Sequence, residues 1–110
     1  MTLCVMVKSK PILNDEYGFF MDDLRKKLEV EGFPIVYDWQ DAPNTVYPPH
    51  VHQGKVSFYV TDGSIRFSGG INQTVSTGGR IDVPPNIEHS AVVGVDGCRY
   101  VIGQEVAGDA

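Results

Sequence analysis

The sequence PPHVHQGKVSFYVTDG, residues 48–63, holds two of the three histidines of this 110-residue chain, His50 and His52. Because side chains alternate between the two faces of an extended backbone, these two imidazoles point in the same direction on a strand. The apolar run that follows, Val56–Val60, is typical of a buried strand, and Thr61–Gly63 predicts a turn at its end. Two parallel imidazoles on one strand form half of a metal site.

The third histidine, His89, ends a second segment that is rich in glycine and proline, GGRIDVPPNIEH at residues 78–89. The chain contains no histidine besides these three. A metal site built on imidazole therefore depends on whether the fold brings His89 to the pair.

The residues before this region predict one helix, from Asn14 to Glu31, which Gly32 and Pro34 end. Its apolar side chains recur at three- and four-residue steps and form one stripe: Tyr17, Phe20, Met21, Leu24 and Leu28. Earlier still, the apolar segment Thr2–Lys8 predicts a short strand. That strand could pair within its own sheet or with a second subunit.

After Pro34 the sequence consists of short apolar segments separated by turns. The predicted strands are Ile35–Trp39, Val46–His52, Val56–Val60, Ser64–Phe67, Ile71–Ser76, Ile81–Val83, Glu88–Val93 and Cys98–Val106. Asp96–Gly97 is expected to join the last two as a hairpin turn. About eight or nine short strands at this spacing favour an antiparallel sandwich or barrel.

The spacing of the histidines, glycines and one proline resembles the two signature motifs of the cupin superfamily, which are small jelly-roll β-barrels. The matching residues are His50, His52, Gly63, Gly78, Pro84 and His89. The resemblance implies a mostly β protein, an antiparallel jelly-roll barrel with one N-terminal α-helix packed outside. It implies a single domain over residues 1–110: a strand and the helix in 1–33, the barrel in 34–106 and a loose tail in 107–110.

Two positions depart from the cupin motifs. Asn86 stands where the second motif has glycine, and asparagine tolerates the left-handed backbone that such a turn needs. Val56 stands where the first motif has a metal-binding glutamate. The resemblance therefore implies a site with three ligands, His50, His52 and His89, in place of four.

Three neutral imidazoles suit a divalent transition metal such as iron, zinc, nickel or manganese, and they leave positions open for a substrate. Without a carboxylate ligand, the site keeps more positive charge and favours an anionic or chelating ligand. By ligand type, it resembles the three-histidine cupin dioxygenases that act on thiols and diketones.

Two functions of different classes follow. The first is a metal-dependent enzyme acting on a small anionic metabolite, dioxygenase-like or an isomerase, although the sequence indicates no general base. The second is a non-catalytic module that binds or senses a small molecule, with or without metal. Cupins of this size commonly pair, so the resemblance also implies a homodimer.

Other polar and aromatic residues are given weaker roles. Asp82, Glu88 and Arg66 alternate with apolar neighbours and are expected to face solvent. The two cysteines, Cys4 and Cys98, are expected to be reduced and buried. Three aromatic residues could line the barrel mouth or belong to the core: Trp39, Tyr47 and Tyr100.

Composition excludes several classes of partner. The formal net charge is −5, and the one basic cluster is Arg25–Lys27, so nucleic acid is not an expected partner. No apolar run approaches the ~18 residues of a membrane helix. The apolar run Leu3–Val7 has no basic region before it and does not resemble a signal peptide. A cytoplasmic protein with a small-molecule ligand is expected.

Overall fold

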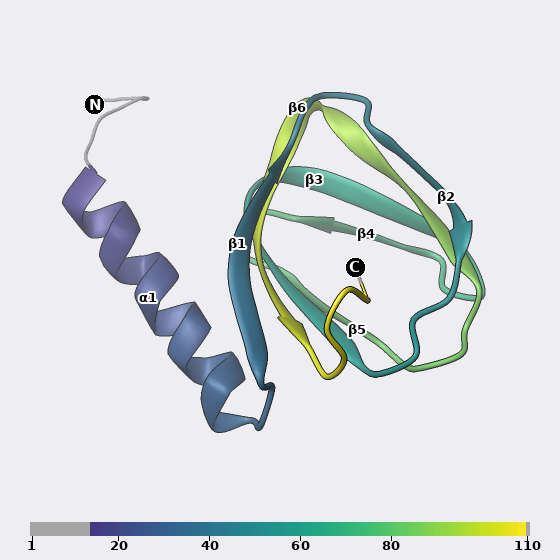
Figure 1. Ribbon diagram of the computed structural model, residues 1–110. Coiled ribbons are helices and arrows are strands. Elements are labelled where there is room, and N and C mark those ends of the chain that lie inside the picture. Colours follow the sequence, from purple (N-terminus) through teal and green to yellow (C-terminus); the bar gives the residue numbers. More distant parts are fainter. Residues whose placement is uncertain (1–13, 110) are drawn as a thin grey trace.

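The computed structural model describes the backbone of residues 14–109 and the side chains of residues 21–109. This part of the chain contains one helix and six strands (Figure 1). They are α1 (Asn14–Val30), β1 (Ile35–Asp41), β2 (Val46–His50), β3 (Val56–Gly69), β4 (Gln73–Ser76), β5 (Arg80–Val83) and β6 (His89–Gln104). The helix has the predicted extent to within one residue, whereas the predicted strand Thr2–Lys8 lies outside the described residues.

The two long strands, β3 and β6, pair with each other in antiparallel fashion at the centre of one six-stranded sheet. The first half of β3 and the second half of β6 are flanked by β5 and β1. The other two halves are flanked by β4 and β2. The strands curl around a common interior (Figure 1), which is the antiparallel jelly-roll architecture. Within residues 14–109, hydrogen bonds do not close the barrel.

Two of the predicted turns are wrong, because Thr61–Gly63 and Asp96–Gly97 do not reverse the chain. They lie inside the continuous strands β3 and β6, where the register shifts between Val60 and Ile65. Gly63 and Gly97 both have positive φ, 78° and 80°. Residues of this kind form hairpin turns in other proteins. In this chain they bend two paired strands together, and the bend folds the sheet over on itself.

The barrel interior is filled by apolar side chains of the two long strands, such as Val60, Phe67, Val93 and Ile102. Along β6, Tyr100 and Ile102 point inward, whereas Val101 between them points outward toward the helix.

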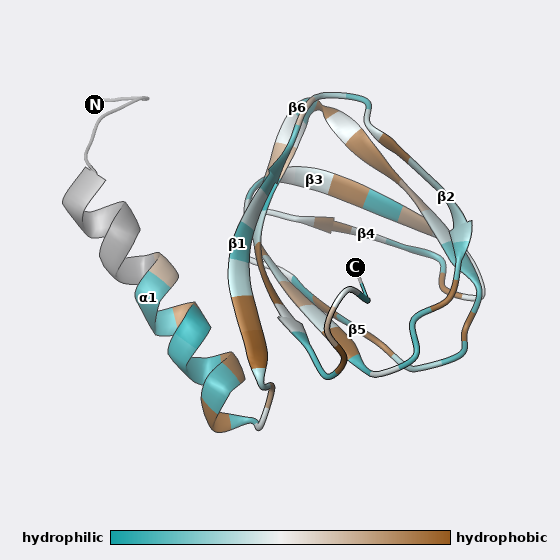
Figure 2. Ribbon diagram, in the orientation of Figure 1, coloured by the Kyte–Doolittle hydropathy of each residue, from teal (hydrophilic) through white to brown (hydrophobic). Residues whose placement is uncertain are grey.

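The helix packs on the outside of the barrel, as the sequence predicts. Its apolar stripe, Met21, Leu24 and Leu28, buries against Phe33 and Val101. Figure 2 shows that the rest of the described helix is largely hydrophilic, as expected for a helix with one buried face. No helix within residues 14–109 is long and apolar enough to cross a membrane.

The strand bend gives a first prediction. A Cβ added at Gly63 would lie 2.0 Å from the carbonyl oxygen of Gly97, a backbone atom that cannot move alone. Gly63→Ala is therefore expected to lower the free energy of unfolding by about 2–4 kcal/mol, combining overpacking with a strained positive φ. Urea unfolding measures the change.

Gly78→Ala is the matched control. Gly78 also has a positive φ, 91°, but nothing lies within 4 Å of the added Cβ. Its expected cost is about 1 kcal/mol, from backbone strain alone. Equal losses in the two variants would contradict the role assigned to the contact between Gly63 and Gly97.

Candidate metal centre

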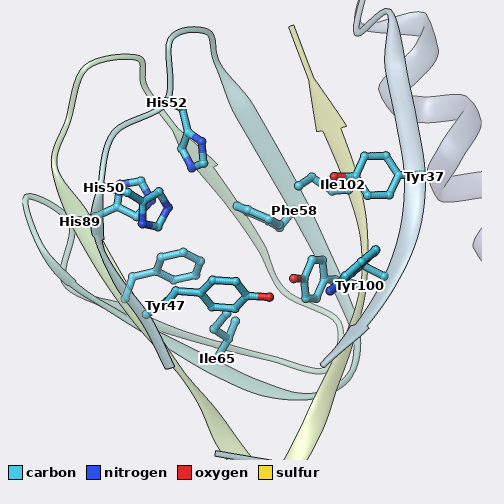
Figure 3. Close-up of a pocket in the computed structure, with 12 residues that line it drawn as sticks. Tyr37, Tyr47, His50, His52, Phe58, Ile65, His89, Tyr100 and Ile102 are labelled. Atoms are coloured by element: carbon cyan, nitrogen blue, oxygen red, sulfur yellow. The ribbon is translucent and has the colours of Figure 1, made fainter. Parts of the chain in front are cut away.

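The fold brings the three histidines together at one end of the barrel. His50 ends β2 and faces His89, the first residue of β6, as its partner in the strand register. His52 follows two residues later and turns into the same space (Figure 3). Ring centroids are 4.5 Å apart for His50 and His89, 4.9 Å for His50 and His52, and 5.0 Å for His52 and His89. One ring nitrogen from each lies within 4.8 Å of the other two.

Each imidazole uses its Nδ1 atom to contact a backbone carbonyl oxygen. The carbonyl partners are Pro48 for His50 (2.7 Å), Ile87 for His89 (2.9 Å) and Asp109 for His52. A carbonyl oxygen only accepts, so Nδ1 is the donor in all three rings and the lone pair of each neutral imidazole lies on Nε2.

His52 shows most clearly that Nε2 is available. Its side chain is 2% exposed, and its Nε2 has no hydrogen-bond partner among the described residues. Burial, followed by the neighbouring His89 and His50, lowers the pKa of His52, which favours the neutral form. A buried lone pair without a partner is costly unless a ligand occupies it. The donor set therefore fits a divalent transition metal.

Asp109 holds the loop that carries His52, a contact that no sequence pattern indicates. Its carboxylate accepts hydrogen bonds from the backbone N–H groups of Gln53 (2.8 Å) and Gly54 (2.9 Å). One carboxylate oxygen is 3.8 Å from His52 Nδ1, and the side chain is 6% exposed. Figure 1 shows the chain after β6 turning back toward the barrel interior. The loose tail expected over residues 107–110 therefore does not describe Asp109.

Val56 gives no ligand to the centre. Its side chain is 0% exposed and belongs to the hydrophobic interior of the barrel. The position expected to carry a glutamate thus contributes packing alone.

A pocket of about 220 Å³ opens beside the histidines. Besides the three imidazoles, it is lined by Tyr37, Trp39, Tyr47, Phe58, Ile65, Phe67, Ala91, Tyr100 and Ile102. Trp39, Tyr47 and Tyr100, which the sequence left open between pocket and core, all line it. Asp82, Glu88 and Arg66 face solvent, as predicted.

A buried carboxylate, Asp41, organises the side of the pocket away from the histidines. It is 8% exposed and accepts hydrogen bonds from Tyr47 OH (2.6 Å), Trp39 Nε1 (2.9 Å) and Tyr100 OH (2.9 Å). Burial, and then the hydrogen bond to Asp41, raise the pKa of Tyr47. Burial also raises the pKa of Tyr100, with contributions from Tyr47 and Asp41. Sequence reasoning placed Asp41 in a turn and missed it, because its three donors converge only in the folded barrel.

Cys98 lies next to this cluster and is buried, as predicted. Burial, followed by the charges of Asp41 and Asp62, raises the pKa of its thiol to about 12. The thiol is therefore protonated at neutral pH and is unsuited to act as a nucleophile.

Comparison with known proteins identifies solved structures of similar fold. No protein-family model matches the chain, and no curated protein matches it. An RmlC-like cupin from Shewanella frigidimarina NCIMB 400 matches with a TM-score of 0.58 and 20% identity over 68% of each chain. KdgF from Halomonas sp. matches with a TM-score of 0.55 and 21% identity, over 67% of this chain and 70% of that one.

The polyketide cyclase RemF from Streptomyces resistomycificus shows somewhat higher identity, 26%, with a TM-score of 0.56. The match covers 66% of this chain and 54% of the cyclase, so the chain spans about half of that protein's length. Together these matches identify the fold that the proteins share.

The cluster around Asp41 predicts how stability changes at high pH. Below about pH 10 the phenols are protonated in both the folded and the unfolded chain. Above it the unfolded chain loses its phenol protons first, because the pKa values of Tyr47 and Tyr100 are raised in the folded state. The free energy of unfolding is therefore constant with respect to these groups below pH 10 and falls as the pH rises beyond it.

Tyr47→Phe is expected to make this fall less steep, as measured by urea unfolding between pH 9 and 11.5 and by phenolate absorbance. Trp39→Phe is the control, since it removes a donor to Asp41 but no titrating group. An unchanged slope in Tyr47→Phe would show that this phenol is not protected in the folded state.

Proposed function

Because the chain is a small cupin-fold protein, we propose that it is a metal-dependent enzyme whose divalent ion is held by His50, His52 and His89. The single observation that carries the proposal is the common orientation of the rings. Each Nδ1 is engaged by a carbonyl, and the Nε2 of His52 is buried without a partner among the described residues. Iron, zinc, nickel and manganese are all compatible with three imidazoles.

The substrate proposed for this site is a small anionic metabolite. Three neutral ligands leave the charge of a divalent ion uncompensated, which favours a carboxylate, thiolate or enolate. When bound, the ion would supply Lewis acidity and, in the case of iron, redox chemistry. The chain's own residues supply the rest: Phe58, Phe67 and Ile65 wall the pocket and exclude water from the reacting groups.

Dioxygenase-like chemistry is our first choice of reaction, because three histidine ligands leave room for more than one small ligand. An isomerase remains the second choice within the same class. The likeness to a polyketide cyclase supports an enzymatic role in general. The homodimer stays a prediction, since the strand that would form its interface, Thr2–Lys8, lies outside the described residues.

A second candidate is a non-catalytic module that binds or senses the same kind of ligand. The observation that favours it is Val56, which replaces the acid of the first motif with a buried apolar side chain. The two candidates differ in turnover. Iron-loaded protein that binds carboxylates but consumes no oxygen and converts no substrate in a panel of thiols, diketones and keto acids would favour the module.

Metal content tests the site itself. Protein purified without an affinity tag is expected to hold about one transition-metal ion per chain, measured by elemental analysis. His52→Ala and His89→Ala are expected to reduce this to background, because two imidazoles bind far more weakly than three. Glu88→Ala is the control, since this exposed carboxylate adjoins His89 in sequence. Full metal content in both histidine variants would refute the proposed centre.

The support given to His52 by Asp109 leads to a separate prediction. Asp109→Asn is expected to weaken zinc affinity about tenfold, because it removes a carboxylate that holds the loop and lies near Nδ1. Competition with a chromophoric chelator measures the affinity.

Glu105→Gln is the matched control. Glu105 also accepts a hydrogen bond from a backbone N–H, that of Lys55 at 2.7 Å. This bond does not involve Gln53 or Gly54, the two residues whose N–H groups bond to Asp109. Its zinc affinity is expected to stay within about twofold of the parent. Equal losses in the two variants would mean that Asp109 acts through general stability.

A further inference from the structure

The pocket is polar at two ends and apolar between them. The histidines lie on one side, and Tyr47 and Tyr100 direct their hydroxyl groups toward one another on the other side (Figure 3). Two phenylalanines connect the ends. The ring centroid of Phe67 is 6.0 Å from that of His89 and 5.8 Å from that of Phe58. The ring centroid of Phe58 is in turn 5.3 Å from that of Tyr100. A ligand that fills this pocket therefore meets aromatic walls in its middle and polar groups at both ends.

Asp41 fixes the direction of the hydrogen bonds at the tyrosine end. A carboxylate only accepts, so the hydroxyl protons of Tyr47 and Tyr100 are directed to it, at 2.6 and 2.9 Å. The indole N–H of Trp39 also donates to the same carboxylate. With their protons engaged, the two phenol oxygens, which also interact with one another, can offer the pocket only their remaining lone pairs. This end therefore accepts a hydrogen bond from a ligand.

Tyr37 brings a third hydroxyl group to the lining of the pocket. Its oxygen accepts a hydrogen bond from Nε2 of Gln104 at 3.0 Å, and Gln104 is itself 2% exposed. The hydroxyl proton of Tyr37 is thus not needed for that bond and can be donated. Figure 3 places Tyr37 on the same side of the pocket as Tyr100. The two phenol oxygens of Tyr47 and Tyr100 therefore suit a ligand group that donates a hydrogen bond, such as a hydroxyl, whereas a carbonyl only accepts.

We propose that the pocket selects a planar, ring-containing ligand that carries a hydroxyl group at the end opposite its anionic head. The aromatic walls suit the ring, Tyr47 and Tyr100 receive the hydroxyl proton, and the histidine end receives the head. The chemical class is a hydroxyaryl carboxylic or keto acid. The position of the anionic head rests on the proposed metal site; the preference for a hydroxyl group does not.

The hydroxyl preference is first measured in metal-free protein, with two ligands that have no chelating head. 4-Methylphenol is expected to bind roughly five- to tenfold more tightly than toluene, as for one buried hydrogen bond with otherwise unpaired acceptors. Zinc-loaded protein is then titrated calorimetrically with phenylpyruvate and 4-hydroxyphenylpyruvate, and with benzoate and 4-hydroxybenzoate, because the two pairs differ in length. The hydroxylated member of at least one pair is expected to bind about tenfold more tightly.

Variants assign the preference to the tyrosine end. Tyr47→Phe removes one acceptor and is expected to reduce the preference to within about twofold. Asp41→Asn places an amide N–H donor against the phenol oxygens and occupies a lone pair that would accept from the ligand, so it is expected to weaken the preference. Glu88→Ala, at an exposed side chain that does not line the pocket, is expected to retain it. Circular dichroism checks folding; should Asp41→Asn fail to fold, the partly exposed Tyr47 still provides the test.

The outcomes separate this inference from the proposed metal site. Equal binding of toluene and 4-methylphenol, no binding of 4-methylphenol at millimolar concentration, or a preference unchanged in Tyr47→Phe would overturn the inference, even if zinc binds. A preference that persists in metal-free protein while no metal binds would uphold it and refute the metal site.

Discussion

The antiparallel pairing of β3 with β6, bent where Gly63 meets Gly97, is the interaction on which the rest of the structure depends. The backbones approach so closely there that a single methyl group would lie 2.0 Å from a carbonyl oxygen. The bend divides β6 into two halves, one of which begins with His89 while the other carries Tyr100. Both ends of the pocket are therefore built on one strand, and the fold of that strand sets their separation.

Residue spacing predicted the parts of the site that follow from local geometry. His50 and His52 were expected on one face, and the second motif placed His89 at the start of a strand; these three residues do meet. The helix could be read from its apolar stripe, because that pattern needs no knowledge of the partner surface. Turn chemistry was less informative. Gly63 and Gly97 adopt the positive φ of a turn residue, but the same conformation also serves a bulge.

The contacts that sequence could not provide are those between residues far apart in the chain. Asp41 accepts a hydrogen bond from Tyr100, which lies 59 residues later in the chain. The backbone carbonyl of Asp109 contacts His52, which lies 57 residues earlier. No local pattern marks either acid as special, since aspartate in a turn or near a chain end is ordinarily solvated. Each becomes visible only when the fold buries it among donors. Both acids act by fixing a proton or a loop, so neither would carry a motif of its own.

The charge distribution of the site explains how it could work without the acid that Val56 replaces. An acid at that position would have to be accommodated within the hydrophobic cluster to which Val56 belongs. Asp109 brings negative charge within 3.8 Å of the Nδ1 side of His52, while the Nε2 side stays open. Under the proposed function, the ion would therefore keep most of its charge toward the pocket. The anionic ligand would then complete its neutralisation, and the tyrosine end would decide which anion fits.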